Sequence, residues 1–330
     1  MPENSIPMTD PLSDLLEMVH ARSAISGRMI AGGEWARRFA NLNAIKFCAA
    51  IEGKAWWFME GMAEPLRFEA GDILVMNGTR PLILASTPGL IRDAENTPLF
   101  RDEAGIYRLG RGEDFIMLGG AVTVDERRQP LLLAGLPPVL VVSSAANEAS
   151  TLGWLLKQLL SELELQGRPG HTIVIAELAQ LLFVKTLRAY LMHAPGNDGG
   201  WLKGLGDKKL APALSRMHSE PARNWNLEEL AQAAGMPRTS FAVRFRRIMG
   251  IPPLTYLTTW RMHIAERDLR TGASIAEIAE AVGYKSESAF SHAFKRIIGV
   301  APGRCRWQQT FGETRLPLPH AEARPFRVVA

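Results

Sequence analysis

Cysteine, histidine and long apolar runs are all scarce in this sequence, and each scarcity excludes a class of protein. The two cysteines, Cys48 and Cys305, lie far apart in the chain, so we expect neither a disulfide framework nor a cysteine-rich zinc site. Residues 21–170 contain no histidine, which excludes a histidine-dependent iron, zinc or copper centre from that stretch. The longest apolar run, residues 131–142, is interrupted by two prolines, so no membrane span is expected.

The composition is that of a globular protein. Apolar residues make up 47% of the 330 residues and charged residues 22%, and a chain of this length forms about two domains. Residues 1–200 carry 18 Lys and Arg against 23 Asp and Glu, whereas residues 201–308 carry 17 against 9. This asymmetry indicates that the second part meets a polyanion such as a nucleic acid, unless the basic surface is only solvated. The N-terminus lacks the basic start and apolar core of a secretory signal, and we expect a cytoplasmic protein.

Residues 26–140 have the pattern of an antiparallel sandwich or barrel. Short apolar runs alternate there with turn signals, namely Glu52-Gly53, Ala70-Gly71-Asp72 and Asn77-Gly78. The runs expected to form strands include Ala44–Ile51, Ala55–Met59, Asp72–Met76, Leu82–Ala85 and Phe115–Val124.

The pattern then changes to helical spacing. Leucines recur at that spacing over residues 152–163, a second helix is expected over 172–193, and a glycine-rich linker follows at 194–200. We therefore predict an α+β protein of two domains. Its segments are an antiparallel β-barrel (1–145), a helical segment with a linker (146–200), an all-α module (201–308) and a flexible tail (309–330).

The all-α module contains two copies of one pattern. An offset of 48 residues, which becomes 49 after one insertion, aligns the alanines, glycines, phenylalanines and prolines of the two copies. Each copy has the parts of a helix-turn-helix, predicted at 227–250 and 275–299. Gly235 and Gly283 permit the left-handed conformation that ends the first helix and turns the chain.

Local signals mark the helices of each copy. Asn226-x-x-Glu229 and Ser274-x-x-Glu277 are capping boxes that start the first helix. A connector helix over 254–269 would hold the two copies in a fixed relation, so that one chain could contact two adjacent segments of the major groove.

The second helix of each copy has an apolar face that we expect to be core: Phe241, Phe245 and Ile248 in the first, and Phe290, Phe294 and Ile297 in the second. The opposite face is then free to enter the major groove, where the N-terminal half reads base edges and later cations hold phosphates. We define the base-contact set as Arg238, Thr239, Ala242, Val243, Glu287, Ser288, Ser291 and His292. The phosphate-contact set is Arg246, Arg247, Lys285, Lys295 and Arg296. For any single member the alternative is a solvated side chain.

The two copies resemble the C-terminal DNA-binding domain of AraC/XylS-type transcription regulators. The residues that carry the resemblance are A-x-A-A-G and F-x-R-x-x-G-x-x-P in the first copy, and A-E-A-V-G-Y and F-K-R-x-x-G-V-x-P in the second. Ala242 and Val243 depart from it, because their positions often carry longer polar side chains in the family. The resemblance implies binding to double-stranded promoter DNA and activation rather than repression, with RNA polymerase as a further partner.

Residues 1–145 resemble the cupin-like sensor domain of one branch of that family, on segments 66–76 and 131–139. This resemblance implies a pocket for an unidentified small-molecule effector inside the barrel, and a homodimer formed through the helices that follow. The aromatic residues that could line the pocket are Trp35, Phe47, Trp56 and Phe58. For each of them, packing in the core is the alternative.

Three functions are therefore compared. The first is a sequence-specific transcription regulator that senses a small molecule. The second is a cupin-type enzyme whose helical domain serves assembly, and the third is a DNA-binding regulator with a vestigial barrel that senses nothing. The missing histidines and the duplicated motif argue against the enzyme, so we expect no catalytic residues, no metal, no cofactor and no membrane partner.

Overall fold

The computed structural model describes residues 10–40, 44–92, 97–103, 105–125, 129–133, 135–145, 149–165, 168–193, 201–269 and 272–306. The chain forms two compact units, which we name here. The barrel unit is Val19–Asp198, and the helical unit is Met1–Met18 together with Gly199–Ala330. The predicted linker at 194–200 and tail at 309–330 lie outside the described residues. A strand-rich unit and a helical unit confirm the α+β class with two domains.

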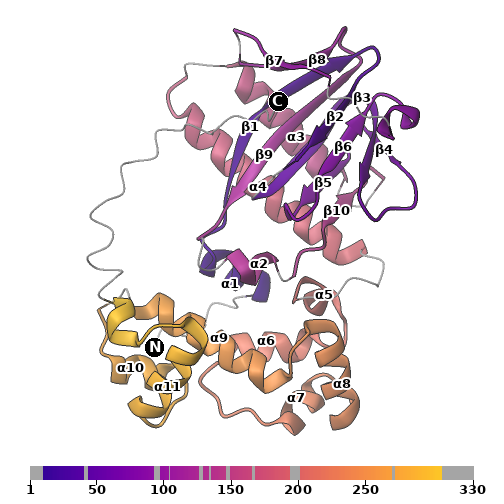
Figure 1. Cartoon of the computed structure of the whole chain (residues 1–330). Coiled ribbons are helices and arrows are strands. Elements are labelled where there is room, and N and C mark those ends of the chain that lie inside the picture. Colours follow the sequence, from indigo (N-terminus) through magenta and orange to yellow (C-terminus); the bar gives the residue numbers. More distant parts are fainter. Residues whose placement is uncertain are drawn as a thin grey trace. The chain divides into compact units, whose positions relative to one another are not determined.

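Ten strands form the sheet of the barrel unit (Figure 1). They are β1 (Arg22–Gly32), β2 (Ala36–Phe39), β3 (Ile45–Met59), β4 (Leu66–Glu69), β5 (Ile73–Met76), β6 (Leu82–Ala85), β7 (Leu99–Arg101), β8 (Tyr107–Gly110), β9 (Phe115–Thr123) and β10 (Val139–Val142). The main order of neighbours is β10-β5-β3-β9-β1-β8-β7, while β4 and β6 pair with β3, and β2 pairs with β6. Among these described pairs only β1 and β8 run parallel.

The long strand β3 replaces two shorter strands that the sequence predicts. The prediction of a turn at Glu52-Gly53 is wrong, because the backbone forms a bulge after Ala50 and the strand continues to Met59. Gly53 has a φ of 76°, and a Cβ on it would lie 1.9 Å from the backbone oxygen of Asp114. A glycine with positive φ suits a turn and a bulge equally well, and the pairing with β9 decides between them.

Buried aromatic rings pack between the strands. The rings of Trp35 and Phe115 stack with centroids 5.8 Å apart, and the centroid of the Phe68 ring also lies 5.8 Å from that of Phe115. Phe47 on β3 covers Gly120 on β9, where a Cβ would meet the ring at 2.0 Å. Phe47 therefore needs glycine as its cross-strand neighbour, and the pair fixes the register of β3 against β9.

The barrel unit also contains helices. They are η1 (Pro88–Ile91), α2 (Gln129–Leu133), α3 (Ala149–Glu164) and α4 (His171–His193). The last two confirm the helices predicted at 152–163 and 172–193; α4 packs against β1 and β10, and α3 packs against α4 (Figure 1). None of the helices described in either unit is both long enough and apolar enough to cross a membrane.

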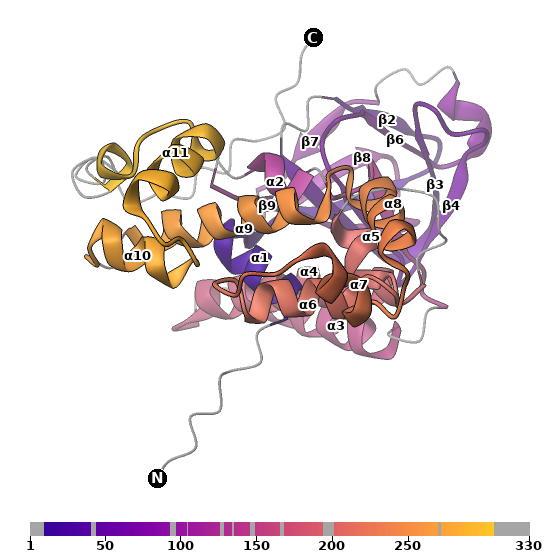
Figure 2. The same cartoon turned by 90° about the horizontal axis from the view of Figure 1, so that it is seen from below.

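The helical unit is built around one long helix. Its helices are α1 (Pro11–Met18), α5 (Trp201–Gly206), α6 (Ala211–Ser219), α7 (Leu227–Ala233), α8 (Arg238–Met249), α9 (Pro253–Asp268), α10 (Ile275–Ala281) and α11 (Glu287–Ile298). The predicted connector is α9, which lies between the α7–α8 pair and the α10–α11 pair in both views (Figures 1 and 2). It contacts α8, α10 and α11 and so joins the two helix pairs.

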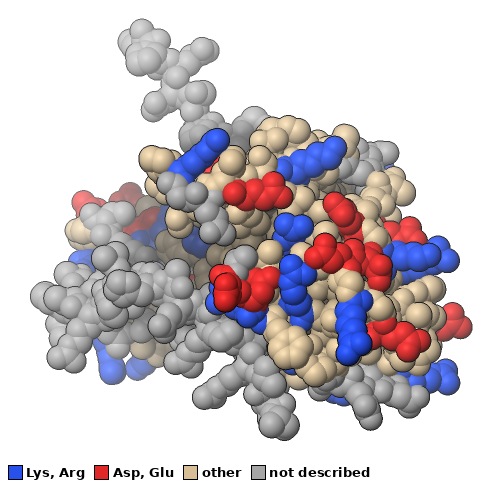
Figure 3. All heavy atoms as spheres, turned by 90° about the horizontal axis from the view of Figure 1, so that it is seen from above, with Lys and Arg blue, Asp and Glu red and all other residues tan. Residues whose placement is uncertain are grey.

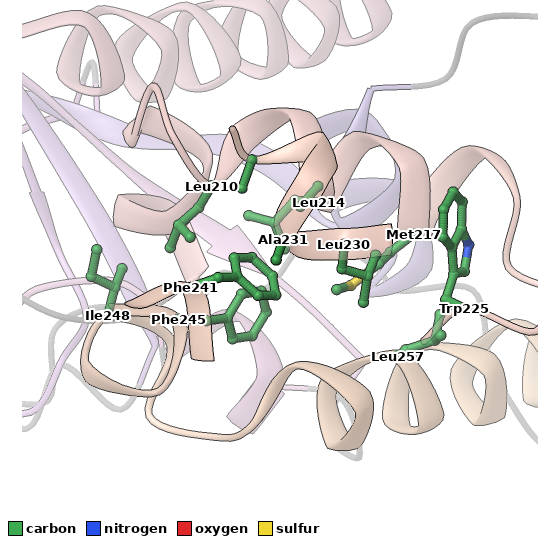
Figure 4. Packing of buried hydrophobic residues seen from close by; sticks show 12 residues of the cluster. Leu210, Leu214, Met217, Trp225, Leu230, Ala231, Phe241, Phe245, Ile248 and Leu257 are labelled. Carbon is green, nitrogen blue, oxygen red and sulfur yellow. The ribbon is translucent and has the colours of Figure 1, made fainter. Parts of the chain in front are cut away.

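Each helix pair has its own hydrophobic core. In the first core, the rings of Phe241 and Phe245 pack edge to face at 5.6 Å and share a cluster with Leu230 and Ala231 (Figure 4). In the second core, Phe290 and Phe294 pack at 5.6 Å in a cluster with Ile278 and Ala279. The small alanine in each cluster lets the two helices of the pair approach closely.

The N-terminal helix α1 belongs to the helical unit, although the sequence analysis included residues 1–145 in the barrel segment. Leu12, Leu15 and Leu16 are buried, and the helix packs against α5, α6 and α9. Because α1 has only eight residues, its hydrophobic pattern is too short to predict which other helices its apolar face packs against.

A buried histidine joins α1 to α6 and α9. The Nδ1 atom of His218 lies 3.0 Å from Oδ2 of Asp14, and its Nε2 atom lies 2.8 Å from the hydroxyl of Tyr256. The imidazole also stacks on Trp260, with 3.8 Å between ring centroids. Burial lowers the pKa of His218 below its usual 6.5, and this effect outweighs the attraction of Asp14 and Asp10 for a protonated ring. The neutral ring can donate to Asp14 and accept from Tyr256 at once.

We expect His218→Gln to destabilise the protein by about 2–3 kcal/mol at about pH 7.5, because it breaks a buried hydrogen-bonded chain. The wild-type protein should lose stability as the pH falls below 6.5, because the unfolded chain then binds a proton that the folded chain resists. The difference between wild type and variant should therefore shrink at about pH 5.5, as measured by urea unfolding.

The matched control is His292→Gln, which changes an exposed histidine and should alter stability by less than about 0.5 kcal/mol. A wild-type advantage that grows on acidification would mean that His218 is protonated in the folded state, and would contradict this account.

Candidate nucleic-acid interface

The structure confirms both predicted capping boxes. At the start of α7, Asn226 Oδ1 accepts from the Glu229 amide at 2.9 Å, and the Asn226 amide donates to the Glu229 carboxylate at 3.0 Å. At the start of α10, Ser274 and Glu277 exchange the equivalent bonds at 3.1 and 2.6 Å. The donated amide hydrogen bonds lower the pKa of both glutamates, so the caps stay ionised and favour each helix N-terminus.

The two turns are closed alike but are not equally crowded. The amide after each glycine bonds back to the carbonyl of the small residue in the first helix, Met236 to Ala231 at 3.0 Å and Tyr284 to Ala279 at 2.8 Å. Gly235 has a φ of 59° with open space around it, whereas Gly283 has a φ of 84°. A Cβ on Gly283 would lie 2.2 Å from the backbone oxygen of Ala222, so the second turn packs directly on the segment before α7.

The second helices present the faces that the sequence predicts. Phe241, Phe245, Ile248, Phe290 and Phe294 are buried, and Ile297 is half-buried. In the base-contact set, Arg238, Thr239, Val243, Glu287, Ser288 and His292 are exposed, and Ala242 and Ser291 are half-buried. The structure therefore gathers the set on two helix faces, α8 and α11, each opposite a core face.

The phosphate-contact set is also exposed, and no carboxylate of the described residues forms an ion pair with any of its members. Two other arginines of this unit are occupied. Arg244 on α8 forms a two-point ion pair with Asp207, with 2.6 Å from Nη2 to Oδ2, and Arg223 binds Glu220 and Glu229 while lying 3.9 Å from the Trp225 ring. The paired arginines hold the fold together, and the unpaired cations remain available for an anionic ligand.

Figure 3 shows one face of the molecule, seen from above the view of Figure 1. Among the described side chains visible there, Lys and Arg are interspersed with Asp and Glu, and they do not gather into a region of one sign.

The structure places the four aromatic pocket candidates in three different surroundings. Phe47 is buried over Gly120, while Trp56 and Phe58 pack, half-buried, against a small cluster that includes Ala85. Trp35 lines a hollow of the barrel unit, and the other three candidates are not among the residues that line this hollow.

That hollow has a volume of about 700 Å³ and is lined by strand and loop residues of the barrel unit. The residues that line it are Gly33, Glu34, Trp35, Gly53, Lys54, Glu69, Ala70, Ser86, Thr87, Asp114, Phe115 and Ser144. Stacked Trp35 and Phe115 lie beside exposed acidic residues and one lysine. The polar members could not be predicted from the sequence, because they come from separate strands and loops that carry no shared motif.

The thiols are poorly suited to chemistry. Cys48 and Cys305 are both buried and neither is part of a disulfide, and burial raises the pKa of the Cys48 thiol to about 12. A thiol with such a pKa holds almost no thiolate at neutral pH. Over the described ranges, no group of three or more His, Cys, Asp or Glu side chains is placed to hold a metal ion.

This architecture defines a class: a DNA-binding protein with two helix-turn-helix motifs and a separate strand-rich unit. Residues 10–192 match the cupin family model, and residues 230–308 match a helix-turn-helix domain model. An AraC-like transcription regulator of Streptomyces lividans is 40% identical over 303 residues, which cover 91% of this chain and 99% of that protein. The chain belongs to the AraC-type family of DNA-binding transcription regulators, with a cupin-like N-terminal domain.

Other relatives span the same length. The HTH-type transcriptional activator RclR of Escherichia coli K12 is 31% identical over 304 residues, covering 90% of this chain and 97% of RclR. Among solved structures, the DNA-binding domain of AdpA in complex with a target DNA is 29% identical with a TM-score of 0.30, and it covers 32% of this chain and 98% of its own. The structure of ToxT from Vibrio cholerae is 15% identical with a TM-score of 0.34 and covers 88% of this chain and 98% of its own.

The unequal crowding of the two turns leads to a prediction. We expect Gly235→Ala to cost about 1 kcal/mol of stability, because it only places a side chain in the left-handed conformation. Gly283→Ala should cost about 3 kcal/mol, because the new Cβ also collides with the backbone at Ala222. Urea unfolding of the two variants compares the same substitution at equivalent positions, and equal losses would contradict the close contact.

Proposed function

We propose that this regulator reads its operator with α8 and α11 together, through the base-contact set and the phosphate-contact set. The observation that supports the proposal is that the two motifs are built alike on either side of α9, and each displays an exposed face with unpaired cations. A face of this kind on the second helix of a helix-turn-helix suits the major groove. The operator would then contain two adjacent segments, one for each motif.

We further propose that the barrel unit senses a small molecule at the hollow beside Trp35 and Phe115. An aromatic wall next to polar groups suits a small ligand that has both an apolar and a polar part. The ligand would shift the population of active protein in proportion to its preference for that state. A small molecule that raises the melting temperature of the protein separates this function from a non-sensing barrel.

A homodimer through α3 and α4 is the third part of the proposal. Helix α4 buries Ala179, Leu182, Phe183 and Leu187 on one side. Apolar side chains also lie exposed on α3 and on the other side of α4, namely Trp154, Ile173, Val174, Leu181 and Met192, with Ile173 69% exposed. Exposed Glu177 and Arg188 lie on the same side of α4 as Leu181. The same face of a second copy, with its apolar and oppositely charged groups, provides a self-complementary partner.

Activation, in contact with RNA polymerase, is favoured over repression because RclR is named a transcriptional activator. The same relatives are named as regulators and not as enzymes, so we propose a cytoplasmic regulator without catalytic activity.

Selection of bound fragments from a random DNA pool should recover one asymmetric site. Single variants should then distinguish the role of the base-contact set from that of the phosphate-contact set. Arg296→Ala should weaken binding to all sequences about equally, because one phosphate contact is lost. For the same reason, the slope of the logarithm of the binding constant against the logarithm of the salt concentration should become less steep by about 1. His292→Ala should relax the preference at one base position, at a cost of about tenfold for the selected sequence. Affinities from fluorescence anisotropy at several salt concentrations measure both effects.

An unchanged base preference in His292→Ala would remove His292 from the base-contact set. Failure to recover any specific sequence with the full chain would contradict the proposed mode of reading.

The dimer is tested by placing a charge on the exposed face of α4 that carries Leu181. We expect Leu181→Glu to weaken dimerisation by more than about tenfold, because a carboxylate would be buried against apolar side chains of the second copy. The matched control is Leu66→Glu, which changes a half-exposed leucine on β4. Light scattering over a range of protein concentrations should show a monomer for the first variant and a dimer for the second. A dimer in both, or a monomeric wild-type protein, would rule out this interface.

A further inference from the structure

An apolar groove lies beside α8, the second helix of the first helix-turn-helix motif. The exposed face of α8 is otherwise polar and cationic. The groove has a volume of about 340 Å³ and is lined by Leu227, Ala242, Val243, Arg246, Pro252, Pro253 and Leu254. Val243 is 64% exposed and Leu254 is 43% exposed, so both present apolar surface to solvent. Apolar side chains exposed together mark a binding surface more often than isolated ones do.

The equivalent positions of the second motif have a different chemistry. With the offset of 49, Ser291, His292 and Gly303 stand where the first motif has Ala242, Val243 and Leu254. The cation is retained, because Lys295 stands in the place of Arg246. Both motifs therefore have a cation at the same position. The first motif has apolar side chains where the second has hydrogen-bonding groups.

The position of Val243 on α8 indicates which chemical group of DNA it would contact. Thr239, Val243 and Arg246 follow one another along the exposed face at helical spacing, with Val243 in the middle. A helix that inserts this face into the major groove brings Val243 to the base edges while Arg246 reaches a phosphate. The apolar group that bases present in that groove is the 5-methyl of thymine.

We propose that Val243, with Leu254 across the groove, binds the 5-methyl group of a thymine in the operator segment of the first motif. The first motif then selects thymine by apolar contact, whereas His292 and Ser288 select their bases by hydrogen bonding. This inference rests on the proposed reading of DNA by α8 and α11, and it adds the chemical feature that the first motif recognises.

The test uses the full chain and the duplex recovered by selection. Each thymidine is replaced in turn by deoxyuridine, which removes the methyl group and keeps every hydrogen-bonding group of the base. One replacement should weaken binding about fourfold, which is the effect of withdrawing one methyl group from an apolar contact. Val243→Ala should weaken binding to the thymidine duplex by a similar factor and should bind the thymidine and deoxyuridine duplexes equally well.

The matched control is His292→Ala, which changes the equivalent residue of the second motif and should retain the fourfold penalty for deoxyuridine. Val243 is exposed and alanine favours helix, so the alanine variant should fold, and circular dichroism checks this. A penalty that disappears in Val243→Ala and persists in His292→Ala establishes the contact.

Two results overturn the inference and leave the proposed function intact. In the first, wild-type protein binds its site specifically and no deoxyuridine replacement changes affinity by more than about 1.5-fold. In the second, Val243→Ala keeps the deoxyuridine penalty and full affinity but no longer activates transcription, which assigns the groove to a protein partner. Failure to recover any specific site overturns both the inference and the proposed function.

Discussion

The burial of two phenylalanines on one face of α8 and two on one face of α11 is the constraint on which the proposed DNA-reading surface depends. Phe241 and Phe245, like Phe290 and Phe294, are fully buried against a short capped helix. Removing these four rings from water sets the rotation of α8 and α11 about their axes. Each helix must then turn its remaining face outwards, and that face carries the unpaired cations.

The relation between the two faces is set by a second group of contacts around α9. Its side chains enter both cores: Leu257 lies in the first and Met262 in the second. Arg261 donates to the backbone oxygens of Pro221 and Arg223, which ties α9 to the segment before the first motif. His218 adds a buried polar link from α9 through α6 to α1. The N-terminal helix α1 is thereby part of the unit that holds α8 and α11.

Much of the candidate interface could be predicted from the sequence, because its signals are local. The capping boxes, the glycine turns and the spacing of phenylalanines each lie within a few residues, and Asn226, Gly283 and Phe290 all have the roles expected of them. Predictions that needed partners distant in the chain were less secure. The turn expected at Glu52-Gly53 is a bulge against β9, and the aromatic pocket candidates lie in different parts of the barrel.

The sequence by itself determined the two helix-turn-helix motifs, the core and exposed faces of their second helices, and the excess of cations around them. Helical period, caps and left-handed glycines act through neighbours in the chain, so no knowledge of the rest of the fold is needed. Tertiary structure alone decided that α1 packs with the helical unit, that strand and loop residues far apart in the chain line the hollow beside Trp35, and that Leu254 and Val243 line one groove. These features depend on which apolar surfaces meet, and that choice is made by residues far apart in the chain.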